Sequence, residues 1–167
     1  MKKQFKIKDL IYHGTISEIK NIDLNAGKGY KDFGKGFYLA YKKEHARGMM
    51  NKKARESLRK SKNNVIKRIY TFKTNQKALD ELNVKVFETA DIEWLDFIIM
   101  CRKCRETPHN YDVVIGPTAD DNTSYCLNAY MEGMYGNPNT IQAKRTLMYN
   151  LEVENLGTQV FIGTKRD

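Results

Sequence analysis

Short runs of apolar and β-branched residues recur along the chain, each bounded by glycine, proline or polar residues. This pattern is typical of strands. We expect strands over residues 10–13, 37–40, 65–72, 84–87, 111–117 and 158–163. The run at 111–117 contains Val113, Val114 and Ile115 in succession and stops at Gly116-Pro117, so we expect it to be a buried strand that ends in a turn.

The segments between these strands carry helical signals. We expect a helical turn over residues 17–22 with Ser17 as its cap, and helices over 42–62, 91–105, 122–133 and 141–148. The helix over 91–105 should turn four residues inward, namely Trp94, Leu95, Ile98 and Ile99. Because short strands and helices do not follow a strict βαβ order, the pattern predicts an α+β fold. No repeat or low-complexity linker divides the chain, which favours a single domain over residues 1–167.

Composition narrows the class of protein. The chain has 167 residues, of which 41% are hydrophobic, too many for a disordered protein. No apolar run approaches the roughly 20 residues of a membrane span, and no apolar segment of a signal peptide follows the charged start. We therefore expect a cytoplasmic protein without membrane contact. The formal net charge of +9 favours an anionic partner, such as nucleic acid, a nucleotide or an acidic protein.

This charge is concentrated in one predicted helix. Residues 42–62 contain nine basic and two acidic residues, a net charge of +7, which leaves +2 for the rest of the chain. Such a helix could lie along a phosphate backbone, or it could simply be a solvated helix face.

The three cysteines, Cys101, Cys104 and Cys126, argue against a disulfide framework. Together with His109 they could in principle form a tetrahedral zinc site. Structural zinc sites usually contain two close ligand pairs, and here there is one. We therefore interpret the cysteines as small residues of the fold and predict no metal.

Two short motifs place a polar aromatic residue beside glycine at the edge of a predicted strand. The first is Tyr12-His13-Gly14-Thr15, and the second is residues 33–40, Phe-Gly-Lys-Gly-Phe-Tyr-Leu-Ala. Taken alone, His13 could be a histidine at a turn and Tyr38 a core residue. The glycine loop over residues 27–36 matches neither a Walker loop nor a dinucleotide fingerprint.

Taken together, the two motifs resemble the NAD-binding core of the ADP-ribosyltransferases. The resemblance is to the branch with a His-Tyr pair, shared by diphtheria toxin and the poly(ADP-ribose) polymerases. Residues 92–97, 112–121 and 158–161 also look like signature segments of a bacterial family in this superfamily that was long labelled only as a domain of unknown function. The resemblance implies a split pair of small antiparallel or mixed sheets with flanking helices.

The resemblance also implies roles for individual residues toward NAD, which would be the substrate. His13 would hydrogen-bond ribose hydroxyls, Gly14 would offer its backbone to the nicotinamide amide, and Tyr38 would stack on the nicotinamide ring. Lys28, Lys35 or another loop cation would meet the pyrophosphate. Further contacts would come from the motif neighbours and from the position where the polymerases carry a second aromatic residue, namely Thr15, Gly36, Phe37 and Met49.

The third motif position departs from the family pattern. Most active members carry glutamate there, and this chain has Gln159. Glutamine can bind a ribose hydroxyl but brings no charge to an oxocarbenium-like transition state, which could slow the chemistry by roughly 10²- to 10³-fold. Four acidic residues could supply a charge nearby, namely Asp120, Asp121, Glu152 and Glu154.

The resemblance therefore implies a mono-ADP-ribosyltransferase that acts on a protein or nucleic acid, contacted by the basic helix over residues 42–62. Bacterial relatives imply a toxin of a toxin–antitoxin or phage-defence system with a small neutralising partner. Two alternatives stay open: an NAD glycohydrolase, and a catalytically silent module that binds NAD or nucleic acid.

Overall fold

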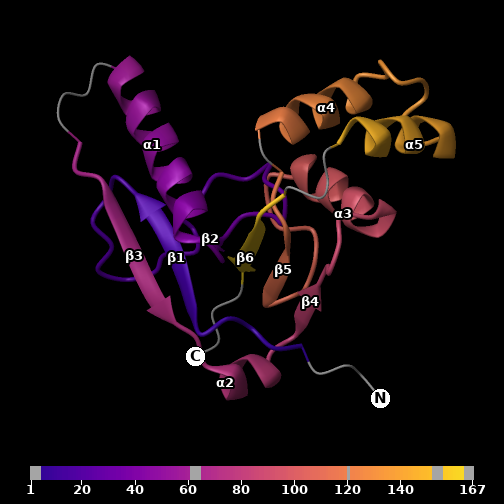
Figure 1. The fold of residues 1–167 in the computed structure, drawn as a ribbon. Helices are drawn as coiled ribbons and strands as arrows, with labels where there is room; N and C mark the ends of the chain where they lie inside the picture. The colour runs from indigo at the N-terminus through magenta and orange to yellow at the C-terminus, as the bar shows by residue number, and fades with distance from the viewer. Residues whose placement is uncertain (1–4, 61–64, 120, 152–155, 164–167) are drawn as a thin grey trace.

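One mixed sheet organises the protein. The computed structural model describes residues 5–60, 65–119, 121–151 and 156–163. Within these residues six strands form a sheet in the order β3-β1-β2-β6-β5-β4 (Figure 1). Only β4 and β5 run parallel; the other neighbouring pairs are antiparallel. The strands are β1 (Leu10–Thr15), β2 (Phe37–Ala40), β3 (Arg68–Lys73), β4 (Val84–Val86), β5 (Val113–Pro117) and β6 (Thr158–Ile162).

Helices cover the two halves of this sheet differently. In Figure 1, α1 stands beside β1 and β3, whereas α3, α4 and α5 gather on the side of β5 and β4. The helices of the described residues are α1 (Lys43–Arg59), α2 (Gln76–Asp80), α3 (Ile92–Arg102), α4 (Asp121–Met131) and α5 (Ile141–Asn150). The two halves meet at β2 and β6, which therefore lie at the centre of the molecule.

Alternating side chains of β5 and β6 supply two separate cores, as expected of strands buried on both faces. Val114 and Phe161 point into the larger core, which is completed by α3, α4 and α5. Val113, Ile115 and Val160 point to the opposite face and join the smaller core. Trp94 of α3 is fully buried in the larger core, where its Nε1–H donates to Pro117 O at 3.0 Å.

The α+β class is confirmed, and so are most of the predicted elements. The strand over 111–117 is buried throughout its β5 portion, and the four predicted residues of α3 face inward. The two expected sheets, however, are one, because β2 pairs with β1 on one side and with β6 on the other. The place where the sheet comes nearest to dividing into two lies between β1 and β2, which share a single register pair, Tyr12 with Ala40.

Besides shifts of one to three residues at the ends of other strands and helices, three parts of the prediction were wrong or incomplete. Residues 17–22 form bends rather than a helical turn, because Ser17 N donates to Thr15 Oγ1 and Ile19 N donates to the Tyr70 hydroxyl. The short helix α2 was not predicted, although Asn75 caps it by accepting from Ala78 N. The basic helix ends at Arg59, and the predicted residues 61–62 lie outside the described residues.

The N-terminus of α3 depends on one carboxylate. Asp91 Oδ1 accepts from Trp94 N at 2.9 Å. We expect Asp91→Ala to lower the free energy of unfolding by about 1 kcal/mol, because the helix loses its side-chain cap. Urea denaturation checks this, and Asp91→Asn, which can still cap, should lose clearly less. Equal losses in the two variants would contradict capping as the cause.

Candidate functional site

The three motif strands lie side by side in the order β1-β2-β6. Ala40 of β2 is the register partner of Tyr12 on one side and of Gln159 on the other. The sheet thus brings the first, second and third motifs together across most of the chain. Because side chains alternate along a strand, Tyr38 and Gln159 project from the same face of β2 and β6.

His13 joins β1 to β2 through its side chain. Its Nδ1 lies 2.6 Å from Tyr38 O, and its ring stacks on Phe37 with centroids 4.3 Å apart. Burial, opposed by this hydrogen bond and assisted by the charges of Lys53 and Lys31, lowers the pKa of His13 to about 4. The ring is therefore neutral at pH 7. Since a carbonyl only accepts, Nδ1 carries the proton and Nε2 is left as an acceptor for a ligand hydroxyl.

This lowered pKa makes stability depend on pH. The unfolded chain protonates His13 below pH 6.5, whereas the folded protein does so only near pH 4. Stability should therefore fall as the pH drops from 6.5 to 4, by about 2 kcal/mol from this residue after allowing for solvent screening of the partly exposed ring. Urea unfolding at pH 7 and pH 4 measures it. His13→Gln, which cannot titrate, should lose correspondingly less over this interval, and an identical loss in both proteins would contradict the assignment.

Tyr38 anchors the glycine loop. Its hydroxyl donates to Gly34 O at 2.6 Å and accepts from Phe33 N at 3.1 Å. Gly34 has φ of +105°, a conformation that favours glycine. The Tyr38 ring meets Phe161 edge to face, with centroids 5.3 Å apart. Burial raises the pKa of Tyr38 well above its ordinary value, with a further contribution from Asp32, so the phenol remains a neutral donor.

Gly14 is the point where α1 touches β1. A Cβ atom at this position would lie 1.8 Å from Ala46 O, so the missing side chain makes room for the helix backbone. The Gly14 carbonyl accepts from Lys53 Nζ at 2.9 Å. Thr15, predicted as a ligand contact, is buried, and its hydroxyl serves the turn at Ser17.

Two lysines face the His13–Tyr38 pair, and the sequence analysis singled out neither. Lys53 lies on Gly14 O, and Lys31 Nζ lies 5.7 Å from the centroid of the Tyr38 ring. Burial lowers the pKa of both ammonium groups; for Lys53, the charge of Lys31 lowers it further. Lys53 is half-buried and Lys31 is exposed. Two neighbouring cations that repel each other are suited to an anionic ligand. Of the loop cations that were named, Lys35 points to Glu106 instead, at 3.6 Å.

The remaining predicted contacts are Gly36, Phe37 and Met49. Gly36 comes directly before β2 and packs tightly against β6, where a Cβ would lie 2.5 Å from Ile162 O. Phe37 stacks on the His13 ring. Met49 is 47% exposed on α1, one helical turn before Lys53 and on the same side of the helix.

Gln159 is buried beside a carboxylate that the sequence analysis did not identify. Its Nε2 donates to Asp32 Oδ2 at 3.0 Å, and Asp32 forms an ion pair with Arg102 at 2.6 Å. No local signal marks Asp32, a single acidic residue in a lysine-rich loop. Of the four acidic residues considered earlier, Asp120 and the two glutamates lie outside the described residues. Asp121 begins α4, but its side chain is not described either.

The cysteines and His109 occupy separate structural roles. Cys101 and Cys126 are buried in α3 and α4, and burial raises the pKa of Cys101 to about 12, which keeps it a thiol. His109 Nε2 pairs with Phe33 O at 2.7 Å, and its Nδ1 accepts from Tyr111 N. Within the described part of the chain, no group of three or more His, Cys, Asp or Glu is arranged to hold a metal ion.

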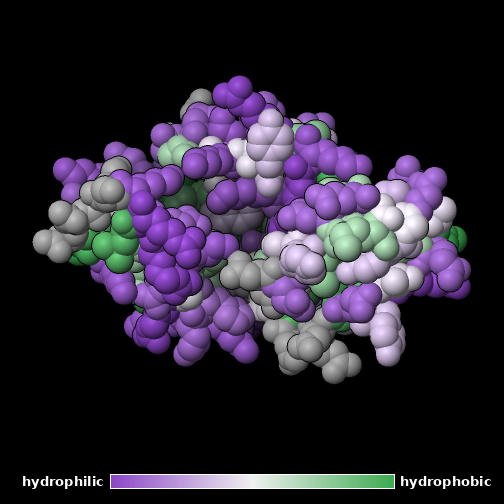
Figure 2. Space-filling view, turned by 90° about the horizontal axis from the view of Figure 1, so that it is seen from above, coloured by the Kyte–Doolittle hydropathy of each residue, from purple (hydrophilic) through white to green (hydrophobic). Residues whose placement is uncertain are grey.

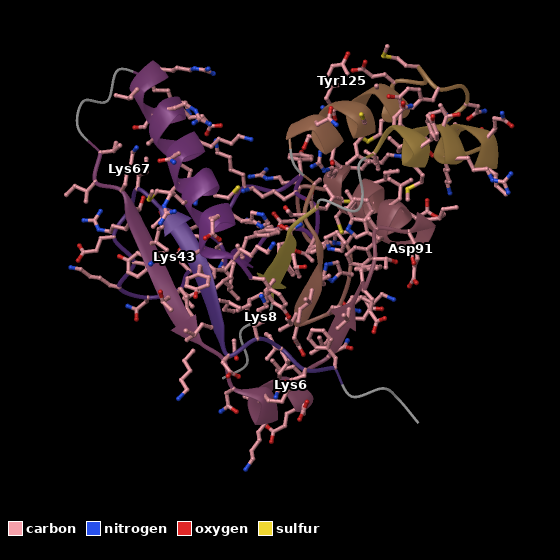
Figure 3. All side chains as sticks on the ribbon, viewed as in Figure 1. Lys6, Lys8, Lys43, Lys67, Asp91 and Tyr125 are labelled. Carbon is pink, nitrogen blue, oxygen red and sulfur yellow. The ribbon has the colours of Figure 1, made fainter. Side chains whose placement is uncertain are left out.

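The basic residues of α1 mostly face outward. Figure 2 shows hydrophilic residues over this side of the molecule and a hollow between it and the α4 side. Lys67, labelled beside α1 in Figure 3, donates from Nζ to Asn51 Oδ1 at 3.1 Å. A depression of about 420 Å³ lies here and contains none of the motif residues; it is lined by Asn51, Ala54, Arg55, Leu58, Val65 and Lys67.

Comparison with known proteins places the chain beside a family of unknown function. The model of a family described as "Protein of unknown function (DUF3990)" matches residues 10–167. No curated protein and no solved structure matches the chain. Among the described residues, no helix is both long enough and apolar enough to span a membrane.

Proposed function

This chain belongs to the DUF3990 family of proteins of unknown function, and from its site we propose that it is an NAD-dependent mono-ADP-ribosyltransferase. One observation carries the proposal: a neutral His13 with an acceptor nitrogen lies beside Tyr38, on adjoining strands, with two lysines facing the pair. NAD offers the matching groups, namely ribose hydroxyls, a flat cationic nicotinamide ring and an anionic pyrophosphate.

In this proposal each group of NAD replaces or meets a group in the site. A ribose hydroxyl donates to His13 Nε2. The cationic nicotinamide ring takes the place of the Lys31 ammonium over Tyr38, which favours binding by about 0.5–2 kcal/mol. Its carboxamide N–H donates to Gly14 O once Lys53 turns from that oxygen toward the pyrophosphate.

The reaction is a displacement at the ribose. The bond between ribose C1′ and nicotinamide N1 breaks, and nicotinamide leaves as a neutral base with the electron pair of that bond. C1′ then bonds a nucleophilic atom of the acceptor, which gives up its proton. Gln159 binds a ribose hydroxyl without contributing negative charge, so we propose transfer of a single ADP-ribose rather than growth of a polymer.

Radiolabelled NAD incubated with the protein and a cell lysate tests this proposal, with His13→Ala as the blank for contaminating enzymes. Label on protein or nucleic acid is the expected result. Free ADP-ribose without labelled macromolecule would instead indicate an NAD glycohydrolase. Binding of NAD without turnover would indicate a silent module, a reading that the uncharged Gln159 favours. No binding and no turnover would overturn the proposal.

We further propose that α1 contacts an anionic acceptor. Arg47 and Arg55 are exposed and lie along one side of the helix, separated by two turns. Replacing both by Gln should lower labelling of the acceptor several-fold at low salt, because each lost phosphate contact weakens binding. NAD hydrolysis in the absence of acceptor should not change. Equal labelling by both proteins at all salt concentrations would contradict an acceptor role for α1.

The resemblance to bacterial members of the ADP-ribosyltransferases extends the proposal to a role in a toxin–antitoxin or phage-defence system with a small neutralising partner. The test is to co-express small proteins encoded beside this gene with the wild type and with His13→Ala. A neutralising partner restores growth only in cells in which the active protein has stopped it.

A further inference from the structure

A buried polar cluster links the glycine loop, α3 and β6. Asp32 is 7% exposed and Gln159 is 9% exposed. Arg102 of α3 donates from Nε to Asp32 Oδ1 at 2.8 Å and reaches Ser124 Oγ with Nη2 at 3.1 Å. On the other carboxylate oxygen, Asp32 Oδ2 accepts from Ala119 N and from Gln159 Nε2, both at 3.0 Å.

These contacts fix the orientation of the Gln159 side-chain amide, that is, the directions of its NH₂ group and of Oε1. The neighbours of its Nε2 are Asp32 Oδ2 and, at 3.5 Å, Pro117 O. Both are acceptors, so the NH₂ group must face them and Oε1 must point away. Without the carboxylate, rotation of the amide by 180° would exchange a donor for an acceptor at the third motif position.

Asp32 also lies at the centre of the other site contacts. Its neighbours in sequence are Lys31, whose ammonium covers the Tyr38 ring, and Phe33, whose N–H donates to the Tyr38 hydroxyl. The negative charge of Asp32 contributes to the raised pKa of Tyr38, which places the carboxylate near both the second and the third motif. One loop residue thus connects Tyr38 with Gln159.

We infer that Asp32 is a positioning residue for Gln159: it fixes the NH₂ end of the amide, so that Oε1 is the end that accepts a ribose hydroxyl of the substrate. The inference rests on the proposed function. A hydrogen bond from Nε2 to a carboxylate also polarises the amide and makes Oε1 a better acceptor. The negative charge of Asp32 therefore acts on the substrate through the Gln159 amide, in place of the charge that a glutamate at position 159 would bring. The pair of residues carries one carboxylate and one amide, with the carboxylate on the loop.

This arrangement predicts that glutamate at position 159 harms the protein when introduced alone. Gln159→Glu would set a carboxylate against Asp32 Oδ2 and Pro117 O, three oxygens without a donor between them. We expect a lower rate of NAD turnover and a fall in Tm of roughly 10 °C. Adding Asp32→Asn places an amide N–H opposite the new carboxylate and keeps the net charge of the cluster, while the hydrogen bond from Ala119 N is lost.

A double-mutant cycle with Asp32→Asn and Gln159→Glu tests the inference, with Tm, kcat and KM for NAD measured on each protein. Asp32→Asn should lower kcat about 10- to 100-fold and change KM less than threefold, because His13, Tyr38 and the lysines still hold the substrate. The double variant should regain part of the Tm lost in Gln159→Glu and recover kcat to within about tenfold of wild type.

Two results would overturn the inference: a folded Asp32→Asn protein with wild-type kcat, or a folded double variant whose losses equal the product of the single ones. If Asp32→Asn alone does not fold, kcat of the double variant is compared with kcat of Gln159→Glu. A higher kcat in the double variant supports the inference, because only an exchange of amide and carboxylate between positions 32 and 159 restores the contact, and an equal or lower kcat overturns it. Failure of the proposed function is recognised separately, because the wild type itself would then leave NAD intact.

Discussion

Gly14→Ala is expected to lower the free energy of unfolding by about 3 kcal/mol or more. The added Cβ would lie 1.8 Å from Ala46 O and 3.0 Å from Met50 Cβ. The first of these atoms belongs to the backbone of α1, which cannot rotate away as a side chain would. The helix must retreat from β1, and overpacking that moves backbone falls at the upper end of the usual range. Urea denaturation at pH 7 measures the loss.

Gly48→Ala is the control, because it makes the same change within α1, the helix that packs on Gly14 of β1. Gly48 is exposed, and a Cβ there would have no atom within 4 Å. Alanine in a helix interior should stabilise the protein by about 0.5–1 kcal/mol. Opposite signs at the two positions are expected, and a Gly14→Ala protein within 1 kcal/mol of wild type would contradict the close packing of α1 on β1.

This prediction also affects how NAD assays are interpreted. Glycine in the first motif has two separate uses in the structure, one for α1 and one for the carbonyl that holds Lys53. Loss of NAD binding in Gly14→Ala would therefore not identify a backbone contact with the nicotinamide. His13 and Tyr38 are better positions for that question, since their side chains can be changed without forcing α1 away.

Elements whose signals are local could be predicted from the sequence. The apolar run of β5 and the spacing of Trp94, Leu95 and Ile98 in α3 each fit one secondary structure and one buried face. The predicted helical turn over residues 17–22 was wrong because a distant group, the Tyr70 hydroxyl, accepts a hydrogen bond from the backbone N–H of Ile19. The sequence also could not show that β2 bridges both halves of the sheet, since pairing is non-local.

The candidate site divides in the same way. His13 and Tyr38 stand in recognisable motifs, whereas Asp32 and Arg102 meet only after the loop packs on α3. Lys53 did have a signal that was overlooked. The buried residues Ala46, Met50 and Ala54 recur every four positions along α1, and Lys53 falls seven residues after Ala46 on that face. Both interpretations of the basic helix, a phosphate contact and a solvated face, considered its charge alone and not the position of Lys53 beside the buried residues.

Tyr38 has two functions that substitution can separate. Tyr38→Phe removes the hydroxyl that pairs with Gly34 O and Phe33 N, so we expect a loss of about 2 kcal/mol in unfolding free energy. Tyr38→Ala also removes the ring packed against Phe161 and should cost about 4 kcal/mol. Tyr149→Phe, at a position 90% exposed, should stay within about 0.5 kcal/mol of wild type.

The affinity for NAD should depend on the aromatic ring of Tyr38 rather than on its hydroxyl. By titration calorimetry we expect Tyr38→Phe to bind NAD within about threefold of wild type, because the aromatic face is kept, and Tyr38→Ala to bind at least about tenfold more weakly. Equal affinity of the two variants would remove the ring from the binding site. A Tyr38→Phe protein as stable as wild type would instead show that the hydroxyl does not hold the glycine loop. Because stability reports the loop contact and affinity reports the ring contact, either function can fail without the other.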